Sequence, residues 1–159
     1  MTRVVRLFGM RIRANNLLLS PVGSGTASID LSRATRLEGV AFRYNGSKDL
    51  NWVIRTLRTI TPEHRHLRQI SIYVPSRLTS FDVGANIGQT IGGTITRQWL
   101  DLDHLLVQFW ESRLIRPRVE CVRLGQRRQS AEYCVGGLLP ETTKRGIIDL
   151  VEYRKCHWM

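Results

Sequence analysis

A short apolar pattern that occurs twice restricts the fold of this chain more than any other feature. In each copy a leucine is followed three positions later by one apolar residue, and two positions after that by another. The copies, 30 residues apart, are Leu37-x-x-Val40-x-Phe42 and Leu67-x-x-Ile70-x-Ile72. The alternation that closes each copy is typical of a strand, because successive side chains of a strand point to opposite faces. The pattern therefore predicts two equivalent strands.

A helix is predicted between these strands, over residues 50–60. Asp49 is expected to cap its N-terminus, and Thr61-Pro62 is expected to end it. Its apolar residues recur at spacings of three and four, which places them on one helix face. They are Leu50, Val53, Ile54, Leu57 and Ile60. A strand, a helix and a strand in this order predict a parallel βαβ unit.

The alternation of strands and helices continues to the C-terminus. Strands are predicted at residues 118–124 and 147–153, with a short helix at 138–145 between them. A longer helix is predicted over 85–115, and its second half has an apolar stripe made by Trp99, Leu102, Leu106 and Phe109. We therefore expect an α/β fold with a mainly parallel sheet and crossover helices.

Residues 1–159 are predicted to form one domain with a frayed tail at 154–159. A leucine pattern followed by a helix is the unit of leucine-rich repeats, whose neighbouring units bury each other's apolar faces. The later strands do not keep the spacing, since Val119 lies 52 residues beyond Leu67. We expect a leucine-rich-repeat-like, irregular end piece, and an ordinary small α/β layer is the alternative.

The chain is strongly basic, and its charge is unevenly distributed. It has 24 Lys and Arg residues against 13 Asp and Glu, a net charge of +11, and 21 of the bases are arginines. Residues 1–80 carry +9 and residues 81–159 carry +2. This asymmetry favours a polyanion-binding half or a fragment separated from an acidic neighbour. Arginine also suits bidentate pairing with carboxylates or phosphates and is common in protein interfaces.

Seven arginines of the first half form the candidate binding surface, here named the arginine set. The arginine set consists of Arg33, Arg36, Arg43, Arg55, Arg58, Arg65 and Arg68, with Arg77 further along the chain. On a stack of βα units these residues would form a continuous positive ridge. The ridge could face a protein partner or neutralise nucleic-acid phosphates. Aromatic residues are few nearby, so a solvated or partner-facing ridge is favoured over nucleic acid.

Two other polar clusters are interpreted as structural. The carboxylates of Asp101-x-Asp103-His104 lie in a helical pattern, where positions i and i+2 do not share a face. A solvated helix face, or acids near the positive N-terminal end of a helix, is therefore predicted. His64-x-His66 lies in a predicted turn and is interpreted as a basic surface turn instead of a zinc site.

The remaining candidates lack the spacing that their chemistry requires. The cysteines at 121, 134 and 156 are too far apart for a zinc knuckle. The stretch Gly23-Ser24-Gly25-Thr26 lacks the lysine of a phosphate loop. The glycines at 84, 88 and 92 are interpreted as a close-packed or loosely structured turn. No catalytic set, metal, cofactor or small-molecule substrate is predicted.

The location of the chain follows from what the sequence lacks. Three scattered cysteines fit a reducing compartment. There is no apolar signal core and no run of about 18 apolar residues, so no secretion and no membrane span is predicted. An intracellular location, cytoplasmic or nuclear, is expected.

Four stretches carry a resemblance to a known family. They are DLSRATRL (30–37), LRQISI (67–72), QWLDLDHLLVQFWES (98–112) and LLPETTKRGIIDL (138–150). Together they resemble the C-terminal portion of the F-box and leucine-rich-repeat-like proteins of basidiomycete fungi, over roughly residues 20–153. In such proteins an F-box docks a ubiquitin-ligase scaffold and the repeats present a surface to a target.

The resemblance implies a protein-interaction surface. An F-box would not fit before residue 20, so the chain is expected to be a short paralogue or a truncated product that keeps this surface. We therefore expect a non-enzymatic protein–protein interaction module with a protein partner still to be identified. The alternative is nucleic-acid binding through the arginine set. An enzyme built on the strand ends is disfavoured, because no nucleotide loop and no nucleophile–base pair is found.

Overall fold

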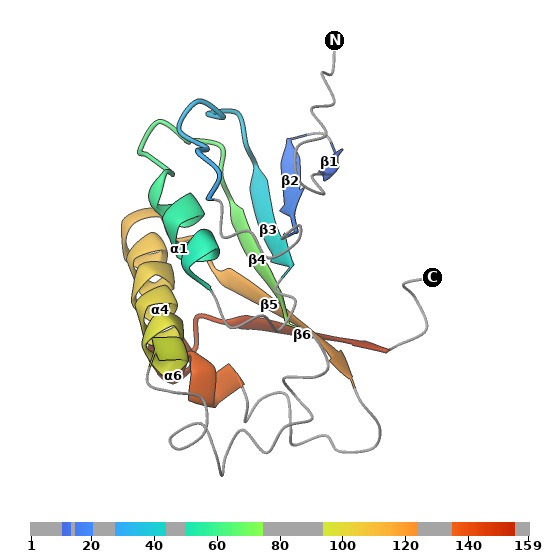
Figure 1. The fold of residues 1–159 in the computed structure, drawn as a ribbon, viewed down its shortest axis with the longest axis vertical. Helices are drawn as coiled ribbons and strands as arrows, with labels where there is room; N and C mark the ends of the chain where they lie inside the picture. Colours follow the sequence, from blue (N-terminus) through green and yellow to red (C-terminus); the bar gives the residue numbers. More distant parts are fainter. Residues whose placement is uncertain are drawn as a thin grey trace.

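The strands of the sheet follow one another in space in the same order as along the chain. The computed structural model describes residues 11–13, 15–20, 28–43, 50–74, 94–123 and 135–154. Within these ranges the chain forms a six-stranded sheet (Figure 1). Its strands are β1 (Arg11–Arg13), β2 (Asn16–Leu19), β3 (Gly39–Arg43), β4 (Gln69–Val74), β5 (Pro117–Arg123) and β6 (Asp149–Arg154). From β2 to β6 all neighbours are parallel, and β1 pairs antiparallel with β2.

The helices of the described ranges occupy the connections between the parallel strands. They are α1 (Asn51–Arg58), α4 (Thr94–Arg113) and α6 (Pro140–Lys144). Right-handed crossovers that always advance in one direction place their helices on one face of a sheet. Figure 1 shows all three helices on the same side. The predicted α/β fold with a parallel sheet and interleaved helices is confirmed.

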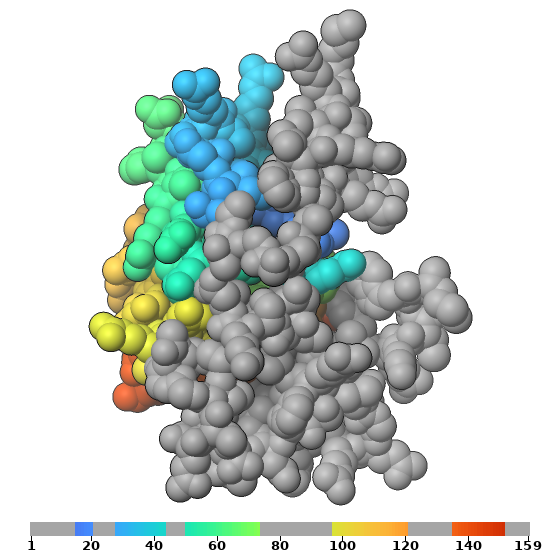
Figure 2. All heavy atoms as spheres, viewed as in Figure 1, coloured from blue at the N-terminus to red at the C-terminus, as the bar shows by residue number. Residues whose placement is uncertain are grey.

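The two copies of the apolar pattern fold alike. Val40 pairs with Ile70 and Phe42 pairs with Ile72 across β3 and β4, so the copies lie in register. The turns before the two strands also match, because equivalent backbone hydrogen bonds recur 30 residues apart. These bonds are Leu37 N to Ala34 O at 3.1 Å and Leu67 N to His64 O at 3.2 Å. The two turns lie side by side in Figure 2, where they are blue and green.

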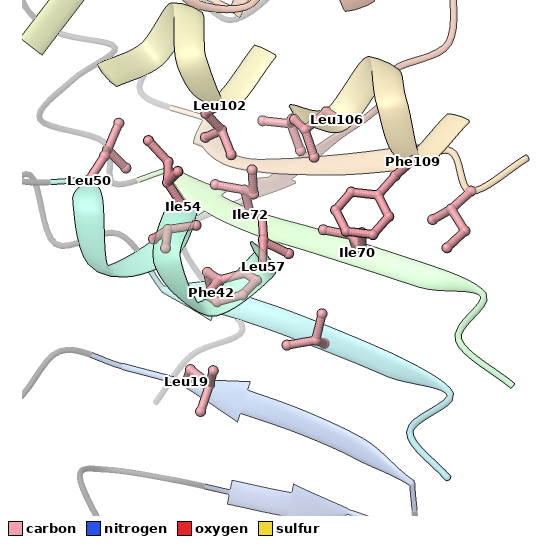
Figure 3. Packing of buried hydrophobic residues seen from close by; sticks show 14 of the residues in the cluster. Leu19, Phe42, Leu50, Ile54, Leu57, Ile70, Ile72, Leu102, Leu106 and Phe109 are labelled. Atoms are coloured by element: carbon pink, nitrogen blue, oxygen red, sulfur yellow. The ribbon is translucent and has the colours of Figure 1, made fainter. Parts of the chain in front are cut away.

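The core lies between the sheet and the helices. Leu102 and Leu106 of α4 are fully buried, and Trp99 is 3% exposed. Figure 3 shows side chains of α1 and α4 meeting those of the strands. Phe42 of β3 meets Trp52 of α1 edge to face, with ring centroids 5.7 Å apart. The apolar stripe predicted for the second helix is therefore part of this core.

The start of α1 differs from the prediction. Asp49 was expected to cap it, but the helix begins at Asn51 with Leu50 at the N-cap, which has no side-chain cap. The Leu50 N–H donates instead to Oε1 of Gln98 in α4, at 2.8 Å. The side chain of Gln98 thus accepts a backbone N–H at the start of α1 although it belongs to another helix.

The C-terminal elements also shift slightly from their predicted bounds. Gly146 has a φ of 64° directly after α6, and the N–H groups of Gly146 and Ile147 donate back to Thr143 and Thr142 carbonyls. This left-handed glycine ends the helix. The predicted tail begins too early, because Arg154 belongs to β6; residues 155–159 lie outside the described ranges.

Candidate functional site

Five members of the arginine set come together at the edge where the parallel strands begin, which we name the amino edge. The turn before β3 carries Arg33 and Arg36, the turn before β4 carries Arg65 and Arg68, and Arg58 ends α1. All five side chains are exposed. The turns adjoin because β3 and β4 are neighbouring parallel strands. This edge therefore carries five of the seven residues of the arginine set.

Two members of the arginine set lie elsewhere. Arg43 is the last residue of β3, at the opposite end of the strand from the amino edge. Arg55 lies inside α1, almost one helical turn before Arg58. Both are exposed. The sequence predicted one continuous ridge through all seven residues, and the position of Arg43 shows that this part of the prediction is wrong.

Acidic residues interrupt the positive charge of the amino edge. Asp30, Glu38 and Glu63 lie in or beside the same turns, and all three are exposed. Hydrogen bonds from the Ser32 side chain and backbone hold the pKa of the Asp30 carboxyl below its usual value. Asp30 is therefore ionised at neutral pH, and it partly offsets the arginines beside it.

His64 connects the two turns from within the protein. It is fully buried, which corrects the prediction of a surface turn for this residue, whereas His66 is exposed. Its Nε2 lies 2.8 Å from the Leu31 carbonyl, and its Nδ1 accepts the Thr61 N–H at 3.1 Å. Because a carbonyl oxygen can only accept, Nε2 is the donor to Leu31. His64 thus joins the turn before β4 to the turn before β3.

Arg113 fixes the same turn from the other side. Its guanidinium donates from Nη1 to the His64 carbonyl at 2.9 Å and from Nη2 to the Thr61 carbonyl. Arg113 ends α4 and follows Phe109 by four residues, so it continues the apolar stripe of that helix. The sequence showed this spacing but gave no reason to assign Arg113 to the site.

An open groove lies between the end of α1, the turn before β4 and the second half of α4. Its volume is about 690 Å³. Ile60 and Leu105 are half-buried and contribute apolar surface, and the buried Leu57, Leu67 and Phe109 lie behind it. The polar groups come from Arg58, Arg65, Arg113, Gln108 and Ser112. We name it the helix groove. Two members of the arginine set therefore share one concave surface with a third arginine that the sequence did not indicate.

The acidic cluster of α4 has a structural role. Asp103 is fully buried, and its carboxylate accepts hydrogen bonds from Glu141 N at 2.7 Å, Thr142 N at 3.0 Å and Thr142 Oγ1 at 2.8 Å. It therefore caps α6, and the predicted solvated face is wrong for this residue. Asp101 and His104 are exposed, as predicted.

The remaining candidates give no site within the described ranges. No group of three or more His, Cys, Asp or Glu side chains that could hold a metal is found there. Among the helices that are described, none is sufficiently long and apolar to cross a membrane. Outside these ranges lie Cys134, Cys156, Arg77, the 23–26 loop and the three glycines at 84, 88 and 92.

His64→Ala is expected to lower the free energy of unfolding by about 2 kcal/mol, because it leaves the buried Leu31 carbonyl without its imidazole donor and opens a cavity. Chemical denaturation monitored by circular dichroism measures the change. His66→Ala, the exposed neighbour, is the matched control and is expected to change stability by less than about 0.5 kcal/mol. Equal stability of the two variants would contradict the bridging role of His64.

The chain was also compared with known proteins. No family model, no curated protein and no solved structure matches it.

Proposed function

We propose that the chain is a non-enzymatic protein–protein interaction module, built as an irregular leucine-rich-repeat-like stack. In line with its resemblance, it would serve as the recognition part of an F-box-like protein. One observation carries the proposal: two equivalent turns, 30 residues apart, adjoin at the amino edge and are joined by His64. Repeats that stack in this way present their exposed side chains on a fixed scaffold.

The two turns share one buried leucine, and the exposed position that follows it differs between them. Leu37 and Leu67 are equivalent and both are buried. At the next position in each turn Glu38 corresponds to Arg68, and both are exposed. A shared buried leucine with different exposed neighbours suits a recognition surface, since specificity comes from the exposed side chains and the scaffold holds them in place.

Nucleic-acid binding is the second candidate, favoured by the four arginines of the two turns. Arg33, Arg36, Arg65 and Arg68 could together neutralise several phosphates. The carboxylates interspersed among them repel phosphates, which weakens this candidate relative to a protein partner. A protein partner can instead pair its own acids and bases with both signs of charge on the amino edge.

The two candidates predict different responses to nuclease and salt. The tagged chain would be purified from a fungal lysate with and without nuclease, its partners identified by mass spectrometry, and the best partner purified and bound again. We expect a protein that survives nuclease and rebinds stoichiometrically. Its affinity should fall by about tenfold or less between about 50 and 200 mM salt, whereas nucleic-acid binding through four phosphate contacts would fall by roughly fiftyfold or more.

The proteins that are recovered, and the salt dependence of binding, support or overturn the proposed interaction module. Ubiquitin-ligase subunits among the rebinding proteins would support the F-box-like assignment. Loss of every retained protein after nuclease, together with a steep salt dependence for a labelled single-stranded RNA, would overturn the interaction module in favour of nucleic-acid binding.

A further inference from the structure

We propose that the helix groove binds an acidic segment of a partner protein that also carries apolar side chains. This inference rests on the proposed function, because it names the chemistry that an interaction module of this shape would recognise. It is supported by the charge at the groove's rim, by the apolar surface inside it and by the way its walls are held.

The rim of the helix groove offers two available cations. The guanidiniums of Arg58 and Arg65 are exposed and make no hydrogen bond or ion pair with any residue within the described ranges. Arg113 lies on the same surface and adds a third positive charge, although two of its donors serve backbone carbonyls. A guanidinium pairs well with a carboxylate, which it can hold through two parallel hydrogen bonds. The groove therefore favours a segment with Asp or Glu.

The interior of the helix groove is apolar and partly accessible. Ile60 and Leu105 are half-buried and pack against the core, so one side of each still faces the groove. Covering this surface with an apolar side chain removes it from water and contributes to affinity. Single-stranded nucleic acid binds instead by stacking on aromatic side chains, and the groove's phenylalanine, Phe109, is only 8% exposed. The surface thus fits a peptide better than a nucleic acid.

The walls of the helix groove are held in place before any partner binds. One wall is the turn before β4, which His64 and Arg113 fix through the hydrogen bonds already described. The other walls are α1 and α4, and Gln98 of α4 accepts the N–H at the start of α1. A preformed groove loses little conformational freedom on binding, so its contacts translate into affinity more fully.

The test uses a fluorescein-labelled peptide in which Glu alternates with Leu and Phe, and binding to the whole chain is followed by fluorescence anisotropy. We expect saturable binding that Arg58→Glu with Arg65→Glu weakens by about tenfold or more. Arg97→Glu with Lys144→Glu is the matched control: it makes the same change of charge at exposed residues of α4 and α6 that lie outside the arginine set and do not line the groove. This control is expected to weaken binding by less than about threefold.

Two comparison peptides separate the contribution of charge from that of apolar contacts. Replacing Leu and Phe of the probe by Ser should abolish saturable binding, and replacing Glu by Gln should do the same. Equal binding of the serine peptide would overturn the inference, since charge alone would then explain the attraction. Equal weakening by the two double variants would overturn it as well. All substituted residues are exposed, so circular dichroism and thermal unfolding should show folded variants.

Failure of this inference and failure of the proposed function give different results. If the partner recovered after nuclease binds the Arg58→Glu, Arg65→Glu variant as tightly as the native chain, the groove is not its docking site and the interaction module stands. If no protein partner survives nuclease, the proposed function fails, whatever the peptide does.

Discussion

Replacing Trp99 with alanine is expected to lower the free energy of unfolding by about 3–5 kcal/mol. Trp99 is 3% exposed and belongs to the apolar cluster between α4 and the sheet. Its truncation removes a large apolar surface from the core and leaves a cavity that the surrounding strands cannot fill. Since domains of this size are stable by only about 5–15 kcal/mol, the loss is a large part of the total.

Leu100 provides the control for Trp99 because it is the next residue of the same helix. It is 40% exposed, so Leu100→Ala is expected to change stability by less than about 0.5 kcal/mol. Urea denaturation followed by circular dichroism measures both variants without depending on tryptophan fluorescence. An unfolding curve for Trp99→Ala that coincides with that of Leu100→Ala would show that α4 does not pack on the sheet through this face.

Replacing Asp103 with alanine is expected to cost about 3 kcal/mol of stability. The substitution removes the carboxylate that accepts two backbone N–H groups and the Thr142 hydroxyl at the start of α6. Asp103 and Thr142 are fully buried, so water cannot readily replace the lost acceptor. An uncapped and partly buried helix start is costly, because its N–H groups lose their hydrogen bonds.

Two substitutions test whether the cap itself causes this loss. Asp103→Asn keeps one acceptor oxygen of similar shape and is expected to lose about half as much stability as Asp103→Ala. Asp101→Ala removes an exposed carboxylate from the same helix and is expected to be nearly neutral. Denaturant midpoints rank the three variants. A neutral Asp103→Ala would contradict the capping role.

Much of the fold could be predicted because local patterns determine it. The spacing of Val53, Ile54 and Leu57 indicated the first helix, and all three residues are buried against the sheet. The alternation over residues 67–74 indicated a strand that the structure gives as β4, Gln69–Val74. Periodicity of this kind is contained in a short window of sequence, so it can be read before any tertiary contact is known.

The polar contacts that organise the fold could not be predicted. Gln98 and Leu50 are 48 residues apart, Asp103 and Thr142 are 39 apart, and His64 and Leu31 are 33 apart. A buried polar side chain in a helix looks the same in a sequence as a solvated one, because the difference depends on which backbone group faces it. For this reason Asp103 and His64 were placed at the surface.

The candidate site was predictable only in part. The number and spacing of arginines indicated a basic surface, and the structure gathers Arg58 and Arg65 around one groove. Arg43 is separated from these residues because it lies at the end of β3. The number of basic residues in a sequence does not show such a position. Arg113 was missed because it lies at the end of an apolar stripe, and only the position of the neighbouring turn shows that it faces the groove.

The agreement between strand order and chain order has a consequence for synthesis on the ribosome. From β2 to β6, each strand emerges after the strand beside which it will lie. The growing sheet can therefore add strands one at a time without waiting for a distant part of the chain, as N-terminal-first folding allows. The longest delay falls between β4 and β5, until the helix α4 has been translated. During that interval β4 is an exposed edge strand. This is therefore the stage at which the nascent protein most needs protection from aggregation.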